Sequence, residues 1–249
     1  MNLLNIFLGE FLGTMMLIVL GNGVVSNILY KGTKGHNAGT LTIFITWGFA
    51  VMVGVLTAKS FTDQAGHLNP AVTMYILVKN NTNAATFFTF IGSQILGAAI
   101  GQIIVNTFYW NIANRTENKD IVLHCHANSP IDQKKWFNNV FAEFVGTIVL
   151  LTVVAVLGTS FFSQKDATSV TTLVQVIIVG FTIMVIGGAL GGQTGYSINP
   201  ARDLIPRIVY QLTPFTNKTS ANWSYSWVPV FGPLLAGVVV GAFARLITL

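Results

Sequence analysis

The chain has 249 residues, of which 52% are hydrophobic and only 8% are charged, and its mean hydropathy is +0.64. Soluble domains carry about 25% charged residues, so this composition argues against a soluble enzyme or binding domain and indicates a membrane protein. The net charge of +5 comes from basic residues scattered among polar segments with no basic stripe, so we expect no nucleic-acid partner.

Six stretches with few or no charged residues follow one another along the chain. They are residues 3–29, 38–58, 84–113, 137–162, 168–190 and 223–244. Each is near or above the ~20 residues that a helix needs to cross a bilayer. The first has no basic leader and no small-residue cleavage site, so we interpret it as a retained span and not as a signal peptide. We expect a single transmembrane domain over 1–249 and no soluble one.

The tripeptide Asn-Pro-Ala occurs twice, at residues 69–71 and 199–201. Asn is a favoured helix N-cap and Pro is favoured at the first helical position, so each copy predicts the start of a helix. The apolar runs that follow are short, because Lys79 ends the first, and Pro206 and Arg207 break the second. Neither run can cross the hydrocarbon core. Paired, interrupted segments in two halves of a membrane protein indicate a pore built from half-helix N-termini.

The two halves of the chain repeat each other. Residues 9–14 read Gly-Glu-Phe-Leu-Gly-Thr, and residues 142–147 read Ala-Glu-Phe-Val-Gly-Thr. Each half, about 1–113 and 137–249, holds three spans and one half-span, with the loop 114–136 between them. An odd number of spans makes the second half enter from the opposite side. We therefore predict an all-α membrane protein with six transmembrane helices and two re-entrant half-helices in an inverted repeat.

The repeat places one glutamate early in the first span of each half, at Glu10 and Glu143. A carboxylate inside a span costs ~2.5–3.5 kcal/mol or more unless it is partnered. The irregular backbone that leads into each half-helix has amide groups that need acceptors inside the protein. We expect the two glutamates to support these loops. The alternative is a proton relay, which would need a chain of ionisable groups inside the spans, and the sequence does not provide one.

The single cysteine, Cys125, excludes an intrachain disulfide and lies in the string His124-Cys125-His126 within the longest loop. Adjacent residues rarely converge on one ion, and no second group of ligands is evident in the sequence. We therefore expect an exposed loop thiol, no metal site and no cofactor.

Two segments carry a resemblance to a known family. Ala-Gly-His-Leu-Asn-Pro-Ala at 65–71 and Gly-Tyr-Ser-Ile-Asn-Pro-Ala-Arg-Asp at 195–203 resemble the two signature loops of the aquaporin superfamily, the major intrinsic proteins. The resemblance covers almost the whole chain and implies a six-span fold with two half-helices. It also implies a pore through each subunit of a homotetramer in the cell membrane, surrounded by the lipid bilayer.

Physical reasoning about the pore agrees with the resemblance. Two helix N-termini that meet head to head place about half a positive charge each at the pore centre. Asn69 and Asn199 are expected to donate their side-chain amides to a passing water or hydroxyl, which orients its oxygen and breaks a proton wire, while the positive potential rejects cations. The unwound backbone before each asparagine offers carbonyl acceptors, which are those of Ala65, Gly66, His67 and Leu68, and of Gly195, Tyr196, Ser197 and Ile198.

The resemblance also assigns a selectivity filter, formed by Trp47, Gly187, Tyr196 and Arg202. The position of Gly187 resembles a histidine in water-selective members, so the glycine is expected to leave space for a larger solute. Trp47 and Tyr196 would then form an apolar corner, and Arg202 would donate hydrogen bonds to hydroxyl groups. The alternative for Trp47 is an ordinary interfacial aromatic residue. Tyr196 departs from the phenylalanine common at its position.

Three further positions, Asp203, Arg207 and Pro229, resemble the glycerol-conducting branch, the aquaglyceroporins or glycerol uptake facilitators. We therefore expect passive conduction of glycerol and other small uncharged solutes, with water, while ions and protons are excluded. A water-selective channel is the main alternative, and Gly187 and Asp203 argue against it. An ion-coupled transporter would need more intramembrane acids than the two glutamates. A membrane enzyme would need a nucleophile–base pair or a metal cluster within the spans, so we expect no enzyme.

Overall fold

The computed structural model describes residues 2–159 and 169–247, and within these ranges six helices are long and apolar enough to cross a membrane. They are α1 (Leu3–Leu29), α2 (Thr40–Lys59), α4 (Ala84–Phe108), α7 (Trp136–Leu157), α8 (Ser169–Leu190) and α10 (Val228–Leu246). Two shorter helices, α3 (Pro70–Asn80) and α9 (Pro200–Leu212), follow the two Asn-Pro-Ala motifs. The order of long and short helices is therefore the same in both halves, which confirms the predicted fold class.

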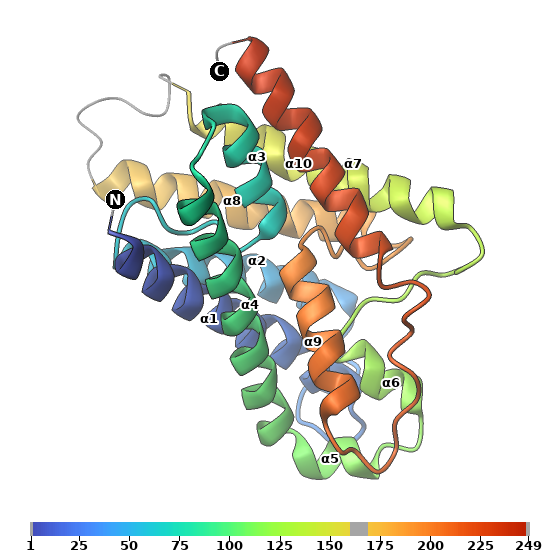
Figure 1. Ribbon diagram of the computed structural model, residues 1–249. Coiled ribbons are helices and arrows are strands. Elements are labelled where there is room, and N and C mark those ends of the chain that lie inside the picture. The colour runs from blue at the N-terminus through green and yellow to red at the C-terminus, as the bar shows by residue number, and fades with distance from the viewer. Residues whose placement is uncertain (1, 160–168, 248–249) are drawn as a thin grey trace.

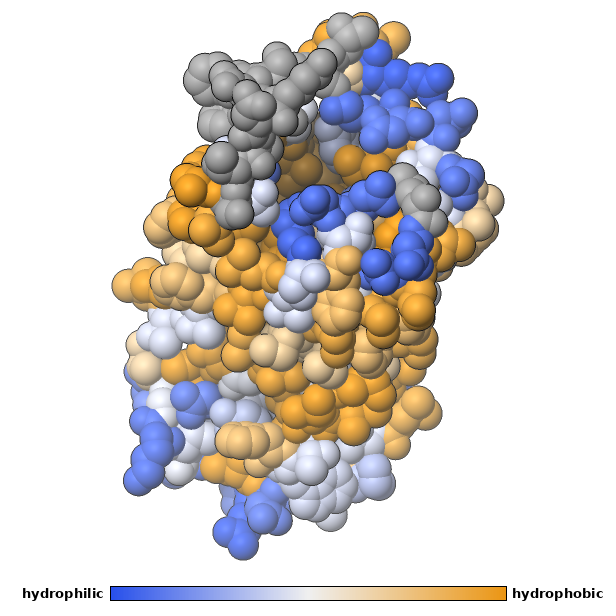
Figure 2. Space-filling model, turned by 90° about the vertical axis from the view of Figure 1, so that its left-hand side faces the viewer, coloured by the Kyte–Doolittle hydropathy of each residue, from blue (hydrophilic) through white to orange (hydrophobic). Residues whose placement is uncertain are grey.

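The two termini lie at one end of the molecule, and the segment that connects the two halves lies at the other end. Figure 1 shows both termini toward the upper left, and the short helices α5 (Trp110–Arg115) and α6 (Lys119–His124) at the lower right. We call these ends the terminus face and the α5–α6 face. Between them, Figure 2 shows a broad apolar belt with hydrophilic residues gathered at its two ends. Such a belt fits the hydrocarbon core of a bilayer.

Both half-helices begin where the sequence predicts. The Asn69 side-chain oxygen accepts a hydrogen bond from the Ala71 amide at 2.8 Å, and the Asn199 oxygen accepts from the Ala201 amide at 3.0 Å. In each case proline occupies the first turn. Backbone N–H groups there have no partner within the helix, so the N–H that proline lacks costs no hydrogen bond.

Pro206 and Arg207 break the apolar run of the second half-helix but not the helix itself, because α9 continues from Pro200 to Leu212 with Pro206 inside it. An interior proline removes one intrahelical hydrogen bond, but neighbouring helices can stabilise such a segment in a membrane protein. Here α9 packs against α4 and α10. Arg207 is compatible with the buried helix because its guanidinium is fully paired, as described below.

Two span boundaries differ clearly from the predictions. The third span ends at Phe108 and does not reach residue 113. The helix is interrupted at Tyr109, and a separate short helix, α5, follows it. The last span starts at Val228 and not at residue 223, because residues 223–227 form turns. The predicted end of the fourth span, at residue 162, lies outside the described residues.

Helix contacts depend on glycine where two backbones approach closely. α1 packs against α2 and α4, α10 against α3 and α7, and α2 against α8. A Cβ atom on Gly97 of α4 would collide with the Phe11 carbonyl oxygen of α1, and one on Gly101 would lie 2.7 Å from the Met15 carbonyl oxygen. Small residues four apart are the usual means of such an approach between membrane helices.

Replacing Gly97 with valine should therefore destabilise the fold, by about 1–3 kcal/mol as expected for overpacking. The matched control is Gly92→Val on the same helix, because a Cβ there would have nothing within 4 Å. Thermal unfolding of the purified proteins in detergent measures both. Equal unfolding temperatures for the two variants would contradict this account of the α1–α4 contact.

Candidate functional site

The irregular segment before α3 is held by Glu10, which is fully buried in α1. Its Oε1 atom accepts hydrogen bonds from the amides of Gly66 and His67, and its Oε2 atom accepts one from Leu68 at 2.8 Å. A fourth bond comes from the Gln94 side chain on α4 at 2.8 Å. The carboxylate thus occupies a concave nest of successive backbone N–H groups, a common arrangement for binding an anion.

Glu143 in α7 makes the equivalent contacts in the second half but fewer of them. It is fully buried and accepts from the Ser197 amide at 3.0 Å and the Ile198 amide at 2.7 Å. Both glutamates therefore lie against the loops that the sequence analysis expects them to support. The Thr194 side chain bonds Glu143, as the Gln94 side chain bonds Glu10, and neither partner was predicted from the sequence.

These bonds orient the carbonyl groups of the two segments. In a trans peptide the C=O and the N–H point in opposite directions. When the N–H of a peptide points toward a glutamate, the C=O of the same peptide, which belongs to the preceding residue, therefore points away from it. In the first segment this applies to the carbonyls of Ala65, Gly66 and His67, and in the second to those of Tyr196 and Ser197. None of these five carbonyls accepts a hydrogen bond from the described residues.

A left-handed backbone recurs at matching places in the two segments. The third residue before each asparagine has positive φ, at Gly66 (112°) and Tyr196 (42°), and so does the last residue before it, at Leu68 (52°) and Ile198 (44°). Non-glycine residues adopt this region at a cost of roughly 1–2 kcal/mol. Strain of this kind persists where surrounding contacts fix the backbone, often at functional sites.

The two half-helices meet through a crossed pair of hydrogen bonds. Asn69 Nδ2 donates to the Ile198 carbonyl at 2.8 Å, and Asn199 Nδ2 donates to the Leu68 carbonyl at 2.8 Å. Each amide nitrogen has two hydrogens, so one holds the opposite segment and the other remains available. The Leu68 and Ile198 carbonyls, predicted as acceptors for a solute, are thus partly used inside the protein.

A cavity of about 450 Å³ runs past this junction. Lys59, Asp63 and Lys79 line it where α2 and α3 reach the terminus face, and Trp47, Tyr196 and Arg202 line its other end. The lining also includes Asn69, Asn199, all of Ala65, Gly66, His67 and Leu68, and Ser197 and Ile198. Apolar side chains such as Val51, Ile183 and Val179 cover much of the remaining wall. The cavity thus pairs a polar strip with an apolar one.

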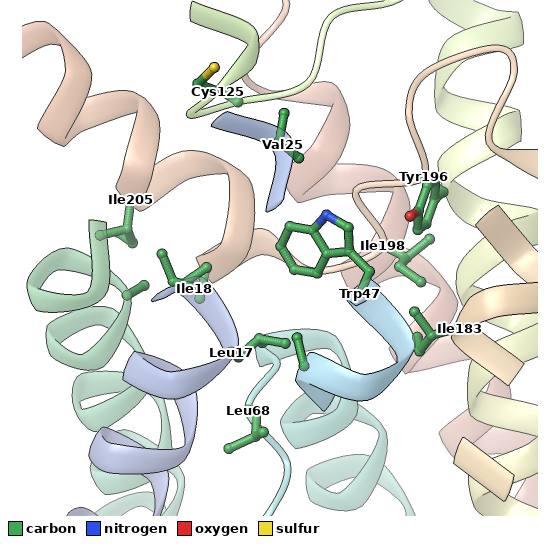
Figure 3. Close-up of a cluster of buried hydrophobic side chains, with 14 of the residues drawn as sticks. Leu17, Ile18, Val25, Trp47, Leu68, Cys125, Ile183, Tyr196, Ile198 and Ile205 are labelled. Carbon is green, nitrogen blue, oxygen red and sulfur yellow. The ribbon is translucent and has the colours of Figure 1, made fainter. Parts of the chain in front are cut away.

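Three of the four predicted filter residues gather at the end of this cavity. The Arg202 guanidinium carbon lies 4.3 Å from the centre of the Trp47 ring, an arrangement that attracts a cation to an aromatic face. Figure 3 shows Trp47 and Tyr196 on separate segments, with Ile183 and Ile198 beside them. The Trp47 indole nitrogen and the Tyr196 hydroxyl are buried without a hydrogen-bond partner among the described residues, and no described residue accepts a bond from the Arg202 side chain. At this end of the cavity the Arg202 guanidinium is therefore the donor free to bind a solute.

Gly187 does not line the cavity, because aromatic rings fill the space beside it. A Cβ atom there would lie 2.9 Å from Tyr196 Cζ and 3.0 Å from Phe44 Cδ1. The two rings pack edge to face, with centroids 5.6 Å apart. The space beside Gly187 is thus occupied by the Tyr196 ring and is not open to a solute. Phe44 is a supporting residue that the sequence analysis did not identify, although it lies one helical turn before Trp47.

Asp203, Arg207 and Pro229, the three positions that resemble the glycerol-conducting branch, lie outside the cavity lining. Asp203 and Arg207 form a fully buried ion pair at 2.7 Å on α9, and Arg207 also donates to the Asn128 and Ala221 carbonyls. The pair therefore fixes two connecting segments to the second half-helix. Pro229 lies buried in the first turn of α10.

The expectation of an exposed thiol is wrong. Cys125 is fully buried in the hydrophobic core, because α6 folds Val122 and Leu123 inward and takes the cysteine with them. Figure 3 shows the thiol near Val25. Burial raises the pKa of Cys125 to about 12. Within the described residues, no group of three His, Cys, Asp or Glu side chains is placed to hold a metal ion.

Comparison with known proteins gives a consistent result. A family model described as Major intrinsic protein matches residues 1–244. Glycerol uptake facilitator protein 3 of Lactiplantibacillus plantarum is 41% identical over 232 residues, which are 93% of this chain and 92% of that protein. A probable glycerol uptake facilitator protein of Thermotoga maritima is 39% identical over 236 residues, with 95% and 96% covered. The X-ray structure of the aquaglyceroporin from Plasmodium falciparum superimposes with a TM-score of 0.83 at 27% identity, covering 99% of this chain and 97% of that one.

The contacts of Glu10 predict the effect of an isosteric change. In Glu10→Gln, either orientation of the amide places an NH₂ group against two hydrogen-bond donors, and unsatisfied buried donors cost about 1–3 kcal/mol each. We expect a lower unfolding temperature and yield, with a smaller loss in Glu143→Gln, because Glu143 accepts fewer bonds from backbone amides. Glu117→Gln, at an exposed glutamate, is the control. A Glu10→Gln protein with parental stability but altered pH dependence of transport would support a proton relay instead.

Cys125 should react slowly with thiol reagents in the folded protein. With its pKa near 12, the thiolate, which is the reactive form, is scarce at neutral pH, and burial blocks access. We expect little modification by N-ethylmaleimide in mild detergent and complete modification after denaturation, as measured by mass spectrometry. Rapid modification of the folded protein would show that the α6 segment does not bury the thiol.

Proposed function

Because the chain belongs to the major intrinsic protein family, we propose that it conducts glycerol and related small uncharged solutes passively, with water using the same pore. It is a multi-pass protein of the cell membrane. The observation that carries the proposal is the cavity, which has carbonyl oxygens and the donors of Asn69, Asn199 and Arg202 along one strip and apolar side chains opposite. A polyol has the same division, with hydroxyl groups on one edge and a carbon backbone on the other.

Each group has a role in this proposal. The free carbonyls accept hydrogen bonds from hydroxyl groups, and the second N–H of Asn69 and of Asn199 donates to a hydroxyl oxygen at the junction. Arg202 donates at the filter and repels cations. The half-helix N-termini add positive potential at the junction. A solute therefore exchanges hydrogen bonds along the pore, while a cation or hydronium ion meets repulsion at two points.

The assembly is part of the same proposal. We expect a homotetramer with one pore in each subunit, embedded in the lipid bilayer. The large exposed apolar side chains, such as Phe49, Phe181 and Phe243, suit contact with lipid or with another subunit. Neither a cofactor nor a catalytic reaction is required by the proposal.

The direct test is stopped-flow light scattering of proteoliposomes that contain the purified protein. We expect glycerol and water permeability well above that of empty vesicles, a glycerol flux that does not saturate readily, and no effect of a proton or sodium gradient. Water permeability without glycerol permeability would indicate a water-selective channel. Accumulation of glycerol against its gradient would indicate an ion-coupled transporter.

A substitution at Gly187 tests the filter. Gly187→Ala must displace the Tyr196 or Phe44 ring, which should narrow the cavity and lower glycerol permeability by about tenfold, equivalent to ~1.4 kcal/mol in the barrier, with a smaller effect on water. Gly188→Ala is the matched control, because nothing lies within 4 Å of a Cβ there. If both variants keep the parental ratio of glycerol to water permeability, Tyr196 does not set the width of the pore.

A further inference from the structure

The segment between α6 and α7 lies against the loop that enters the second half-helix. The Ile131 amide donates to the Gln193 carbonyl at 3.1 Å, and Asn128 Nδ2 donates to the Gly195 carbonyl at 2.7 Å. A Cβ atom on Gly195 would lie 3.0 Å from the Asn128 side-chain carbon, and the glycine has a φ of 80°. Glycine at position 195 therefore allows both the left-handed backbone and the close approach of Asn128.

The position of Asn128 is fixed by the second half-helix and not by its own loop alone. Its amide donates to Asp203 Oδ2 at 2.8 Å, and its carbonyl accepts from Arg207 Nη2 at 2.8 Å. Asp203 and Arg207 are both fully buried and are paired with each other. Three hydrogen bonds thus orient one residue, and the third, from its side chain, reaches the residue immediately before Tyr196.

The two halves differ at this point. Glu10 holds three consecutive amides in the first half, those of Gly66, His67 and Leu68. Glu143 accepts bonds from the amides of Ser197 and Ile198 and bonds the Thr194 side chain, but among the described contacts it does not bond the Tyr196 amide. Tyr196 nevertheless has a strained, left-handed backbone, and its ring lines the cavity. Glu143 restrains the peptide after Tyr196 through the Ser197 amide, and Asn128 restrains the peptide before it through the Gly195 carbonyl.

We propose that Asn128 is a positioning residue for the solute filter: through the Gly195 carbonyl it fixes the Tyr196 backbone, and so the ring that decides which solutes pass. The inference rests on the proposed function and adds to it a residue outside the cavity lining. Loss of this bond should change the ratio of glycerol to water permeability, and it should have less effect on the number of folded, conducting channels. The expected change in the ratio of glycerol to water permeability is about threefold to tenfold, the range for one hydrogen bond.

The experiment compares Asn128→Ala with Asn118→Ala in proteoliposomes that contain equal amounts of protein. Asn118 is exposed in the same connecting segment, and its side-chain oxygen accepts a bond from the Asp120 amide, away from the cavity. If Asn128→Ala folds poorly, Asn128→Ser replaces it, because serine keeps both backbone bonds and its short hydroxyl does not reach Gly195. A merely structural loss would lower glycerol and water permeability together.

A changed ratio in the Asn128 variant, with a parental ratio in Asn118→Ala, supports the inference. An unchanged ratio in a folded Asn128 variant overturns it and leaves the proposed function intact. A parent protein that does not conduct glycerol overturns both.

Discussion

The rest of the structure depends on the crossed hydrogen bonds between Asn69 and the Ile198 carbonyl and between Asn199 and the Leu68 carbonyl. They join two helices that each cross only half of a membrane and that would otherwise present unpaired N-termini to each other in the interior. Each asparagine caps its own helix with its oxygen and binds the opposite segment with its nitrogen. The same two residues therefore begin the half-helices, hold the halves together and leave one donor each for a solute.

A second constraint follows from this junction. The backbone before each asparagine must turn its carbonyls toward the cavity, and its amides then need acceptors in the interior. Glu10 and Glu143 satisfy that need from α1 and α7, so a costly buried carboxylate and a strained backbone stabilise each other. The second half uses fewer bonds to its glutamate, and there the Asp203–Arg207 pair and Asn128 complete the support. The inverted repeat is thus symmetric at the junction and asymmetric around it.

Much of this was predictable from the sequence, because the relevant signals are local. Long uncharged runs predict the spans, and Asn-Pro-Ala predicts both helix starts. The repeated glutamate indicates an acceptor for the irregular backbone. Features that depend on contacts between distant segments were not predictable. Phe44 meets Tyr196 across two helices, Asn128 reaches Gly195 from a polar loop, and no propensity predicts positive φ at Leu68, Tyr196 and Ile198. The burial of Cys125 was mispredicted because the loop around it is polar in sequence but folds α6 onto the core.

The most direct measurement is a double-mutant cycle on the thermal stability of Asn69→Ser, Asn199→Ser and the variant with both changes. Serine is also a good helix cap, so these changes keep the helix starts but remove the amide that reaches across. If the crossed bonds act as one junction, the singles should lose similar stability, and the double variant should lose less than their sum by more than ~0.5 kcal/mol. Additive losses, or single variants as stable as the parent, would contradict the claim that this junction holds the two halves together.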